Sequence, residues 1–388
     1  MKQKTTLPQA IGLALALIAG PTYAGQYTLT DLGIRQFSGN ALTLDINNSS
    51  TVAGTQTYDP QLNLGNRAVI WKVGSGLQEL GTLGGSFSSA LGLNDSGQVV
   101  GYSGNLGFGY SGFVWTESGG MIDIGIPSTS GSQLLDINNA GVAVGRDHVG
   151  FGNPLIWTET TGATGLGALE GGDGAYLFAV NDSGLVVGRS GVTSGMSPTA
   201  FVWSQSDGMK KLGSLSSTYS EAFDISNSGV IVGRNIGPTG AEAVSWDLAG
   251  NMTRLGAGIA TGVNNNNQVV GFRTEGAFLW EDGIGQQQLV LADDNTTFLT
   301  RIDAINDYGQ MVGWLSTGGN TVQGLRAVLL TPTSDVHEAD VLTTLEWRSD
   351  PQLPAPPVPE ASTTVSLLSG TMAFLLGIRR RMGVRKSL

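Results

Sequence analysis

The chain alternates short runs of apolar, β-branched and aromatic residues with polar turns. Residues 83–124 show the pattern once, with runs at 89–93, 98–102, 112–116 and 121–124 separated by turns rich in Gly, Asn and Ser. Runs of this length and composition, bounded by such turns, are typical of β-strands. The pattern therefore predicts units of four short strands, with no long helix among them.

The unit recurs from end to end, with a marker glycine closing its second run about every 43 residues. The marker glycines are Gly54, Gly101, Gly145, Gly188, Gly233, Gly271 and Gly313. Each follows a turn that opens with Asn47, Asn94, Asn138, Asn181, Ser226, Asn264 or Asn306. The next residue is always Asn or Asp, and a Trp ends the third run in every unit but the last. Such a repeat is typical of a β-propeller blade, which buries its faces by stacking on its neighbours.

The last unit lacks a fourth run, and the start of the chain supplies one. Residues 27–33 match the fourth run at 121–125. An open row of blades has no use for an isolated first strand, whereas a closed ring uses it to complete the last blade and remove the exposed edges. The sequence therefore predicts an all-β, seven-bladed propeller of four-stranded blades over residues 25–332, closed by the N-terminal strand in the last blade.

One position of the turn raises a conformational question. The fourth turn residue is Gly in five units, but Ser50 and Asn267 in the other two. Asn tolerates a positive φ, whereas Ser does so poorly. Nothing in the sequence explains the Ser at position 50.

Residues 1–24 have the features of a signal peptide. Lys2 and Lys4 precede an apolar run at 11–19, and small residues lead to Ala24 as the predicted cleavage site. The alternative, a membrane anchor, is disfavoured because the apolar run is short. Beyond the repeats, residues 333–360 form an acidic and then Pro-rich linker.

The C-terminus predicts a second targeting element at 361–388. Residues 363–378 carry no charge, and the tail 379–388 is basic. The positive-inside rule keeps such a tail in the cytoplasm and places the propeller across the membrane. A permanent anchor is the alternative to a transient one.

Two resemblances follow from these residues. The run Val358-Pro359-Glu360-Ala361-Ser362, with the apolar segment and Arg cluster behind it, resembles the PEP-CTERM sorting signal of Gram-negative bacteria. Ala361 stands where that signal usually has a second Pro. The resemblance implies an exosortase as partner, a transient inner-membrane anchor through the C-terminal helix, and release to the cell surface or extracellular matrix.

The repeats themselves resemble the HAF family of extracellular repeats. The resemblance rests on segments 80–85, 90–94, 97–101 and 113–115 and covers nearly all of the ring. The His that gives the family its name is absent, since the equivalent runs are Thr199-Ala200-Phe201 and Gly276-Ala277-Phe278. The resemblance implies an extracellular role without a known biochemical activity.

Composition narrows the function further. The net charge is −11, and it would be about −18 without the two basic end segments, which argues against nucleic acid or an anionic membrane surface as a partner. No cysteine is present, so disulfides, thiolate metal sites and a Cys nucleophile are excluded. The sequence predicts no cofactor.

Catalytic and metal-binding patterns are weak. The two histidines, His148 and His337, lie outside any nucleophile motif. The acidic turns offer one carboxylate each, which favours hairpin turns over calcium sites, so no metal site is expected. A pair of carboxylates from distant blades remains compatible with a hydrolase.

One arc of residues suggests binding. The residues after the marker glycines open variable loops on one face of the ring, and six of these are candidate ligand contacts: Tyr102, Arg146, Arg189, Arg234, Phe272 and Trp314. Arg pairs with carboxylates, and rings stack on sugar faces. We expect an exported binding or scaffolding propeller that engages extracellular polysaccharide or a matrix protein and is not an enzyme. The alternative is a secreted polysaccharide hydrolase or lyase on the same fold.

Overall fold

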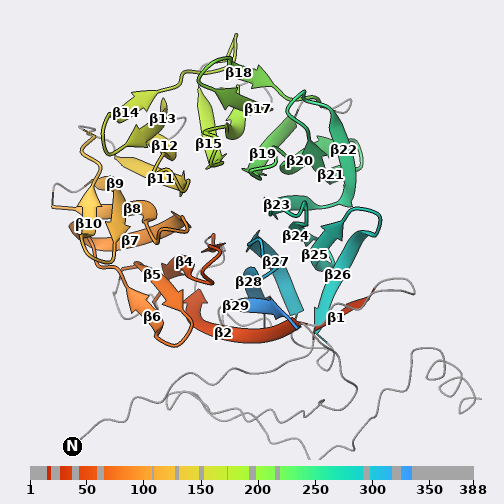
Figure 1. Cartoon of the computed structure of the whole chain (residues 1–388), viewed down its shortest axis with the longest axis horizontal. Helices are drawn as coiled ribbons and strands as arrows, with labels where there is room; N and C mark the ends of the chain where they lie inside the picture. The colour runs from red at the N-terminus through yellow and green to blue at the C-terminus, as the bar shows by residue number, and fades with distance from the viewer. Residues whose placement is uncertain are drawn as a thin grey trace, which may run out of the picture. The chain divides into compact units, whose positions relative to one another are not determined.

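The computed structural model describes residues 15–18, 27–36, 43–58, 65–106, 109–126, 131–147, 153–172, 174–191, 198–214, 219–291, 298–316 and 325–333. These residues belong to one compact unit within residues 1–343. They form seven four-stranded antiparallel blades around a central channel (Figure 1). The predicted seven-bladed propeller is confirmed.

The blades share one strand order, from the channel outward. The innermost strands are β3 (Asp45–Ile46), β7 (Gly84–Leu93), β11 (Ser132–Ile137), β15 (Ala175–Val180), β19 (Tyr219–Ile225), β23 (Ile259–Val263) and β27 (Phe298–Ile305). The second strands are β4 (Val52–Gln56), β8 (Val99–Asn105), β12 (Ala143–Asp147), β16 (Val186–Ser190), β20 (Ile231–Gly237), β24 (Val269–Arg273) and β28 (Met311–Ser316). The third strands are β5 (Arg67–Lys72), β9 (Tyr110–Thr116), β13 (Asn153–Thr158), β17 (Thr199–Ser204), β21 (Gly240–Trp246), β25 (Gly276–Glu281) and β29 (Leu325–Pro332). The outermost strands are β6 (Gly76–Glu79), β10 (Gly120–Asp123), β14 (Gly162–Gly165), β18 (Gly208–Lys211), β22 (Met252–Ala257), β26 (Gly285–Leu291) and β2 (Tyr27–Gln36).

The N-terminal strand closes the ring. Strand β2 pairs antiparallel with β29, with Tyr27 opposite Pro332 and Leu29 opposite Leu330. It therefore completes the seventh blade, as the sequence predicts. Strand β1 (Leu15–Ile18), which falls within the predicted signal peptide, pairs with β26 and links the sixth and seventh blades into one hydrogen-bonded sheet.

The predicted end segments are only partly within view. The acidic and Pro-rich linker, the sorting signal and the predicted span at 363–378 lie outside the described residues. Within the described part of the chain, no helix has the length and apolarity needed to cross a membrane.

The hydrophobic core is divided among the interfaces between adjacent blades. Between the seventh and first blades, Ile34, Leu44, Trp71 and Trp314 pack together, and each is at most 6% exposed. Burying an aliphatic or aromatic side chain of this size contributes about 1.5 to 3 kcal/mol. Each blade is thus stabilised mainly by its two neighbours.

The marker glycines are explained by close approach of the backbone. A Cβ at Gly188 would lie 1.9 Å from the carbonyl oxygen of Tyr176 on the innermost strand. The pairing between these strands shifts by one residue between Leu177 and Ala179, which is a β-bulge. The same close approach recurs at Gly101, Gly145, Gly233, Gly271 and Gly313. The repeated glycine therefore permits a bulge, and the bulge re-aims the side chain at its centre.

Ser50 and Asn267, which replace Gly at the fourth position of the turn, have the positive φ that this position requires in the other units. The φ angles are 58° at Ser50 and 61° at Asn267. Ser50 Oγ donates to Gln310 Oε1 of the seventh blade at 2.7 Å. This cross-blade hydrogen bond offsets part of the strain that the backbone of Ser50 carries.

Candidate functional site

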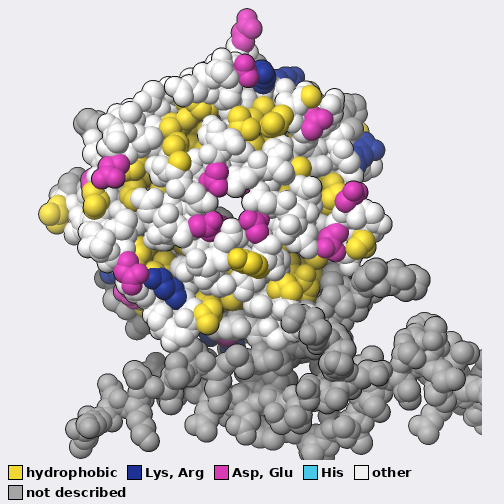
Figure 2. Space-filling model, in the orientation of Figure 1, with side chains coloured by type: hydrophobic (Ala, Val, Ile, Leu, Met, Phe, Trp, Pro, Cys, Tyr) yellow, Lys and Arg dark blue, Asp and Glu magenta, His cyan; other side chains and the backbone are white. Residues whose placement is uncertain are grey.

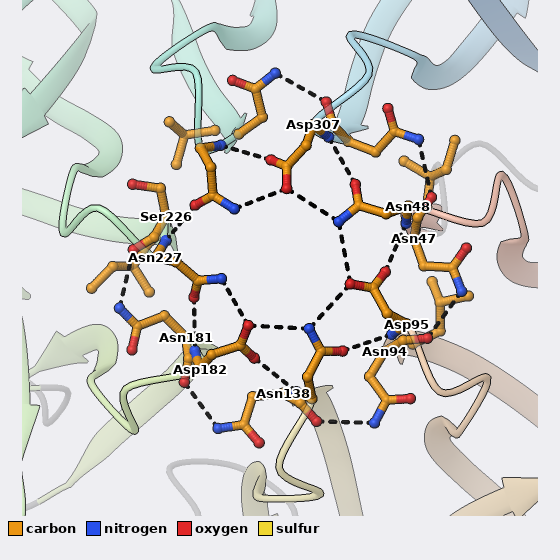
Figure 3. Close-up of a pocket in the computed structure, with 18 of the residues that line it drawn as sticks. Asn47, Asn48, Asn94, Asp95, Asn138, Asn181, Asp182, Ser226, Asn227 and Asp307 are labelled. Atoms are coloured by element: carbon orange, nitrogen blue, oxygen red, sulfur yellow. Dashed lines mark hydrogen bonds between the residues drawn. The ribbon is translucent and has the colours of Figure 1, made fainter.

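The turns between first and second strands form a closed circle of hydrogen bonds at one mouth of the channel (Figure 3). The N–H of each second turn residue donates to a side-chain oxygen of the equivalent residue in the next blade, at 2.7 to 3.0 Å. The members in order are Asn48, Asp95, Asn139, Asp182, Asn227, Asn265 and Asp307. We call this set the turn circle. It ties every blade to the next.

A second circle lies beside the first. In six blades the first turn residue is Asn, and its Nδ2 donates to the carbonyl oxygen of the equivalent residue in the next blade, at 2.9 to 3.0 Å. Ser226 has no amide to make the seventh such bond. The two circles together fix the spacing of the blades at this mouth.

The acids of the turn circle are held by amides. Each of Asp95, Asp182 and Asp307 accepts hydrogen bonds from the Asn side chains on both sides of it, at 2.7 to 3.2 Å. Figure 2 shows acidic side chains gathered around the central opening on this face. Within the described residues, no group of three or more His, Asp or Glu is arranged to hold a metal ion. The hydrogen bonds of these carboxylates join neighbouring members of the turn circle.

Deeper in the channel, on the side away from the turn circle, lies a cavity of about 460 Å³, which we call the channel cavity. Its walls include the residues at the centres of the bulges, which come three positions before each turn: Leu91, Leu135, Phe178, Phe223, Thr261 and Asp303. Leu44 and Phe272 add apolar surface, and Arg234 and Arg301 add charge. The volume and the mixed lining are typical of a small-molecule site.

Three carboxyl groups also line the channel cavity, from alternate blades. In Asp136, Oδ1 accepts from the N–H of Ile137 at 2.7 Å, and Oδ2 accepts from Val180 of the next blade at 2.8 Å. Asp45 and Asp224 make the same pair of bonds. Each carboxyl thus bridges two blades.

Burial within the channel walls shifts these carboxyl groups. It raises the pKa of Asp136 from 3.8 to about 7 and that of Asp224 to about 6. It also raises the pKa of Asp45 well above 3.8, and the nearby charge of Asp136 adds to the effect. Desolvation disfavours the charged form, and the backbone hydrogen bonds oppose this only in part.

The predicted arginines lie close together, and one of them, Arg234, lines this cavity. The guanidinium carbons of Arg146 and Arg189 lie 4.7 and 4.6 Å from the ring centre of Tyr176. Arg234 lies 5.3 Å from the ring centre of Tyr219 and donates to its hydroxyl at 3.1 Å. We call these three arginines and two tyrosines the arginine rim. Each guanidinium stacks on a ring, which adds cation–π attraction.

One buried acid fixes two members of the arginine rim. Glu221, whose side chain is 2% exposed, accepts a hydrogen bond from Arg189 through one carboxylate oxygen and from Arg234 through the other. The side chains of Arg189 and Arg234 are about one quarter exposed. The arginines are therefore anchored from below and keep one edge toward solvent.

Arg301 is anchored in the same way inside the channel cavity. Its Nε donates to the buried Asp303, which also accepts from Leu44 N–H and from the indole of Trp314. Its guanidinium lies 5.7 Å from the ring centre of Phe272. Arg301 lines the cavity, and its two η nitrogens have no hydrogen-bond partner among the described residues.

The other three predicted ligand contacts lie in different places. Phe272 lines the channel cavity, as part of the expected arc. Tyr102 lies apart in the second blade, with its ring 6.2 Å from Phe87 and 5.6 Å from Tyr110. Trp314 is fully buried between the seventh and first blades, so the expectation that it contacts a ligand is wrong. A large apolar side chain at an interface between blades is drawn into the core.

Sequence reasoning missed Glu221, Arg301 and the bulge residues. The marker glycine was a signal for the last group, because it indicates a close approach that a bulge would produce. Each bulge residue stands ten positions before its marker glycine, as Phe178 stands before Gly188. Nothing in the local sequence of Glu221 indicates its two arginine partners, which come from different blades.

Comparisons with known proteins concern the fold. No protein-family model matches the chain, and no curated protein matches it in sequence. Among solved structures, virginiamycin B lyase from Staphylococcus aureus is 10% identical, with a TM-score of 0.54, over 79% of this chain and 100% of the lyase. YCF48 bound to D1 peptide is 12% identical, with a TM-score of 0.48, over 81% of this chain and 97% of YCF48. TolB from Acinetobacter baumannii is 15% identical, with a TM-score of 0.44, over 63% of this chain and 64% of TolB. The similarity to the lyase supports the propeller fold alone.

Proposed function

We propose that this chain is an exported, non-enzymatic binding propeller whose arginine rim engages an acidic extracellular polysaccharide. The observation that carries the proposal is the stacked line of Arg146, Arg189 and Arg234 across three consecutive blades. These cations stand out in a chain whose net charge is −11. A local cationic line in an acidic protein favours an anionic ligand at that place.

The geometry favours a sugar with carboxylate groups. Guanidinium groups pair with carboxylates through two parallel hydrogen bonds when their planes are held in place. Glu221 and the rings of Tyr176 and Tyr219 fix the guanidinium planes of Arg189 and Arg234 in this way. The tyrosines also offer ring faces and hydroxyl groups, which suit the mixed apolar and polar surface of a sugar.

The carboxyl groups of the channel cavity support binding rather than hydrolysis. A hydrolase on this fold would need an acid and a base free to exchange protons with substrate. In Asp45, Asp136 and Asp224, both oxygens already accept backbone N–H groups. Their raised pKa values follow from burial in a structural role. Release of new reducing ends from an acidic polysaccharide by the purified protein would contradict this choice.

We also propose export by the predicted signal peptide and sorting by an exosortase. The motif at 358–362 and the cluster of cations behind residue 378 support this route. The chain would be anchored in the inner membrane before cleavage and reach the cell surface or matrix after it. Replacing Pro359 and Glu360 by Ala should retain the protein in the membrane fraction, and unchanged release would rule the route out.

Binding is tested by measuring retention on immobilised polygalacturonate. The variant carries three substitutions, Arg146→Ala, Arg189→Ala and Arg234→Ala. Because charge-assisted hydrogen bonds contribute about 1.5 to 3 kcal/mol each, we expect retention at least tenfold weaker. The matched control is Lys210→Ala, Lys211→Ala and Arg254→Ala, which removes the same charge from the outer strands β18 and β22. We expect the control to bind within about twofold of wild type. Equal losses in both variants, or none in the first, would reject the arginine rim.

A further inference from the structure

The channel cavity continues inward from the arginine rim, and the two share Arg234. The apolar walls of the cavity come from Phe178, Phe223 and Phe272. A polymer lying on the rim therefore has an adjoining pocket of about 460 Å³ into which part of it can descend. Pockets of this size accommodate small ligands rather than extended chains.

The turn circle lies at the far side of the channel. It borders a separate, smaller space of about 170 Å³. The N–H and side-chain oxygen atoms of neighbouring members are 2.7 to 3.0 Å apart around the whole circle. Widening the opening would break several of these hydrogen bonds at once. The larger space, next to the arginine rim, is therefore the channel cavity.

The charged groups of the cavity are two arginines and four carboxyl groups. Arg301, from the seventh blade, has two η nitrogens that hydrogen-bond to no described residue, and Arg234, from the fifth, has one. Asp303 of the seventh blade pairs with Arg301, and Asp45, Asp136 and Asp224 come from the first, third and fifth blades. A carboxylate can accept about four hydrogen bonds, so the last three acids retain acceptor sites beyond their two backbone partners. Sugar hydroxyl groups are suitable donors to them.

We infer that the channel cavity is a binding subsite for one residue of an acidic glycan, a single sugar ring bearing a carboxylate. Arg301 binds the carboxylate through its two η nitrogens, with Arg234 beside it. Phe223 and Phe272 contact the apolar face of the ring, and Asp45 and Asp136 accept from its hydroxyl groups. The inference rests on the proposed polysaccharide-binding function and adds a pocket for a single acidic sugar ring.

The test uses the full chain with D-galacturonic acid as the probe and D-galactose as the neutral control, in titration calorimetry. Wild type should bind galacturonic acid at least tenfold more tightly than galactose. Leu135→Trp fills the cavity without removing any charged group, and Arg301→Met removes the guanidinium while retaining a long apolar stem. Both variants should weaken galacturonic acid binding at least tenfold. Retention on polygalacturonate through the arginine rim should change less than threefold.

Thermal unfolding of each variant accompanies the titration, and Arg301→Lys provides a folded variant that keeps the charge but loses the two η nitrogens. It should bind at least fivefold more weakly than wild type. The inference is overturned if Leu135→Trp binds galacturonic acid as wild type does. It is also overturned if wild type retains the polymer but does not bind the monomer, a result that leaves the rim intact. Binding of the monomer without retention of the polymer would instead reject the rim and keep the subsite.

Discussion

Glu221 is the side chain on which the arginine rim most depends. It is almost fully buried and accepts from two arginines that come from adjacent blades. An acid in this place neutralises one positive charge and leaves one in excess among the three side chains. The excess charge is available to a ligand, and the fixed orientation lowers the entropy lost on binding.

Replacing Glu221 by Gln should lower the free energy of unfolding by about 2 to 3 kcal/mol, because a charged hydrogen-bonding partner of two arginines is lost. Chemical denaturation measures the change. The control is Glu117→Gln, whose partner Lys72 lies 2.9 Å away and whose own side chain is 75% exposed. That variant should change stability by less than about 0.5 kcal/mol. A loss at Glu221 no larger than at Glu117 would show that the buried pair contributes little.

At the scale of elements, the turn between first and second strands both reverses the chain and joins the blades. The sequence showed the first role plainly, because Asn and Asp followed by Gly favour a tight turn. The second role required coordinates, since the partner of each Asn lies in the next blade. The second circle lacks one of its seven hydrogen bonds, because Ser226 in the fifth blade has no side-chain amide to donate.

Substituting Ser226→Asn should supply the missing amide donor to the carbonyl of Asn264 and stabilise the protein by about 1 kcal/mol. Denaturant titration gives the change in midpoint. The reciprocal variant, Asn181→Ser, removes the existing bond from Asn181 Nδ2 to the carbonyl of Ser226, which is 3.0 Å long. It should be less stable by a similar amount. If both variants moved in the same direction, the circle would not be the cause.

The bulge on the innermost strand is the element that creates the channel cavity. The repeat predicts a first strand in every unit, and β15 (Ala175–Val180) is that strand in the fourth blade. Strict alternation does not show that Phe178 is the extra residue turned toward the channel. The bulge depends on a backbone contact with Gly188 across the strand pair, which a single strand's pattern cannot reveal.

For the whole molecule, the repeat spacing was enough to predict the number of blades and the closing strand. The spacing placed the marker glycines, and the orphan strand at Tyr27 indicated closure in the last blade. The site was predictable in part, because residues after the marker glycines share one end of the ring. Trp314 was assigned to that surface wrongly, since the interface between the seventh and first blades buries it.

The buried carboxyl groups give the whole ring a pH dependence. The pKa values of Asp45, Asp136 and Asp224 are raised in the folded protein, so between about pH 4 and 7 the folded state binds more protons than the unfolded state. Their contribution is fully present below the unfolded pKa and is lost as the pH rises through the folded values. Stability should therefore fall as the pH rises through this window.

The measurement is the midpoint of thermal unfolding from pH 4.5 to 8. Asp136→Asn should make the unfolding midpoint depend less steeply on pH. The variant should also be less stable at every pH, because one backbone hydrogen bond is lost. Asp282→Asn changes an exposed carboxyl in a turn and should leave the slope as it is in wild type. A wild-type midpoint that rises steadily over the same range would contradict the assignment.

The arginine rim and the channel cavity are proposed to recognise acidic sugars. Titration of the full chain with tri-galacturonate, and with its neutral counterpart in which the carboxyl groups are reduced, tests this most directly. We predict that the acidic trisaccharide binds at least tenfold more tightly and that added salt narrows the difference, because the arginine contacts are partly exposed. Equal affinity for the two trisaccharides, or no binding of the acidic one, would contradict the claim.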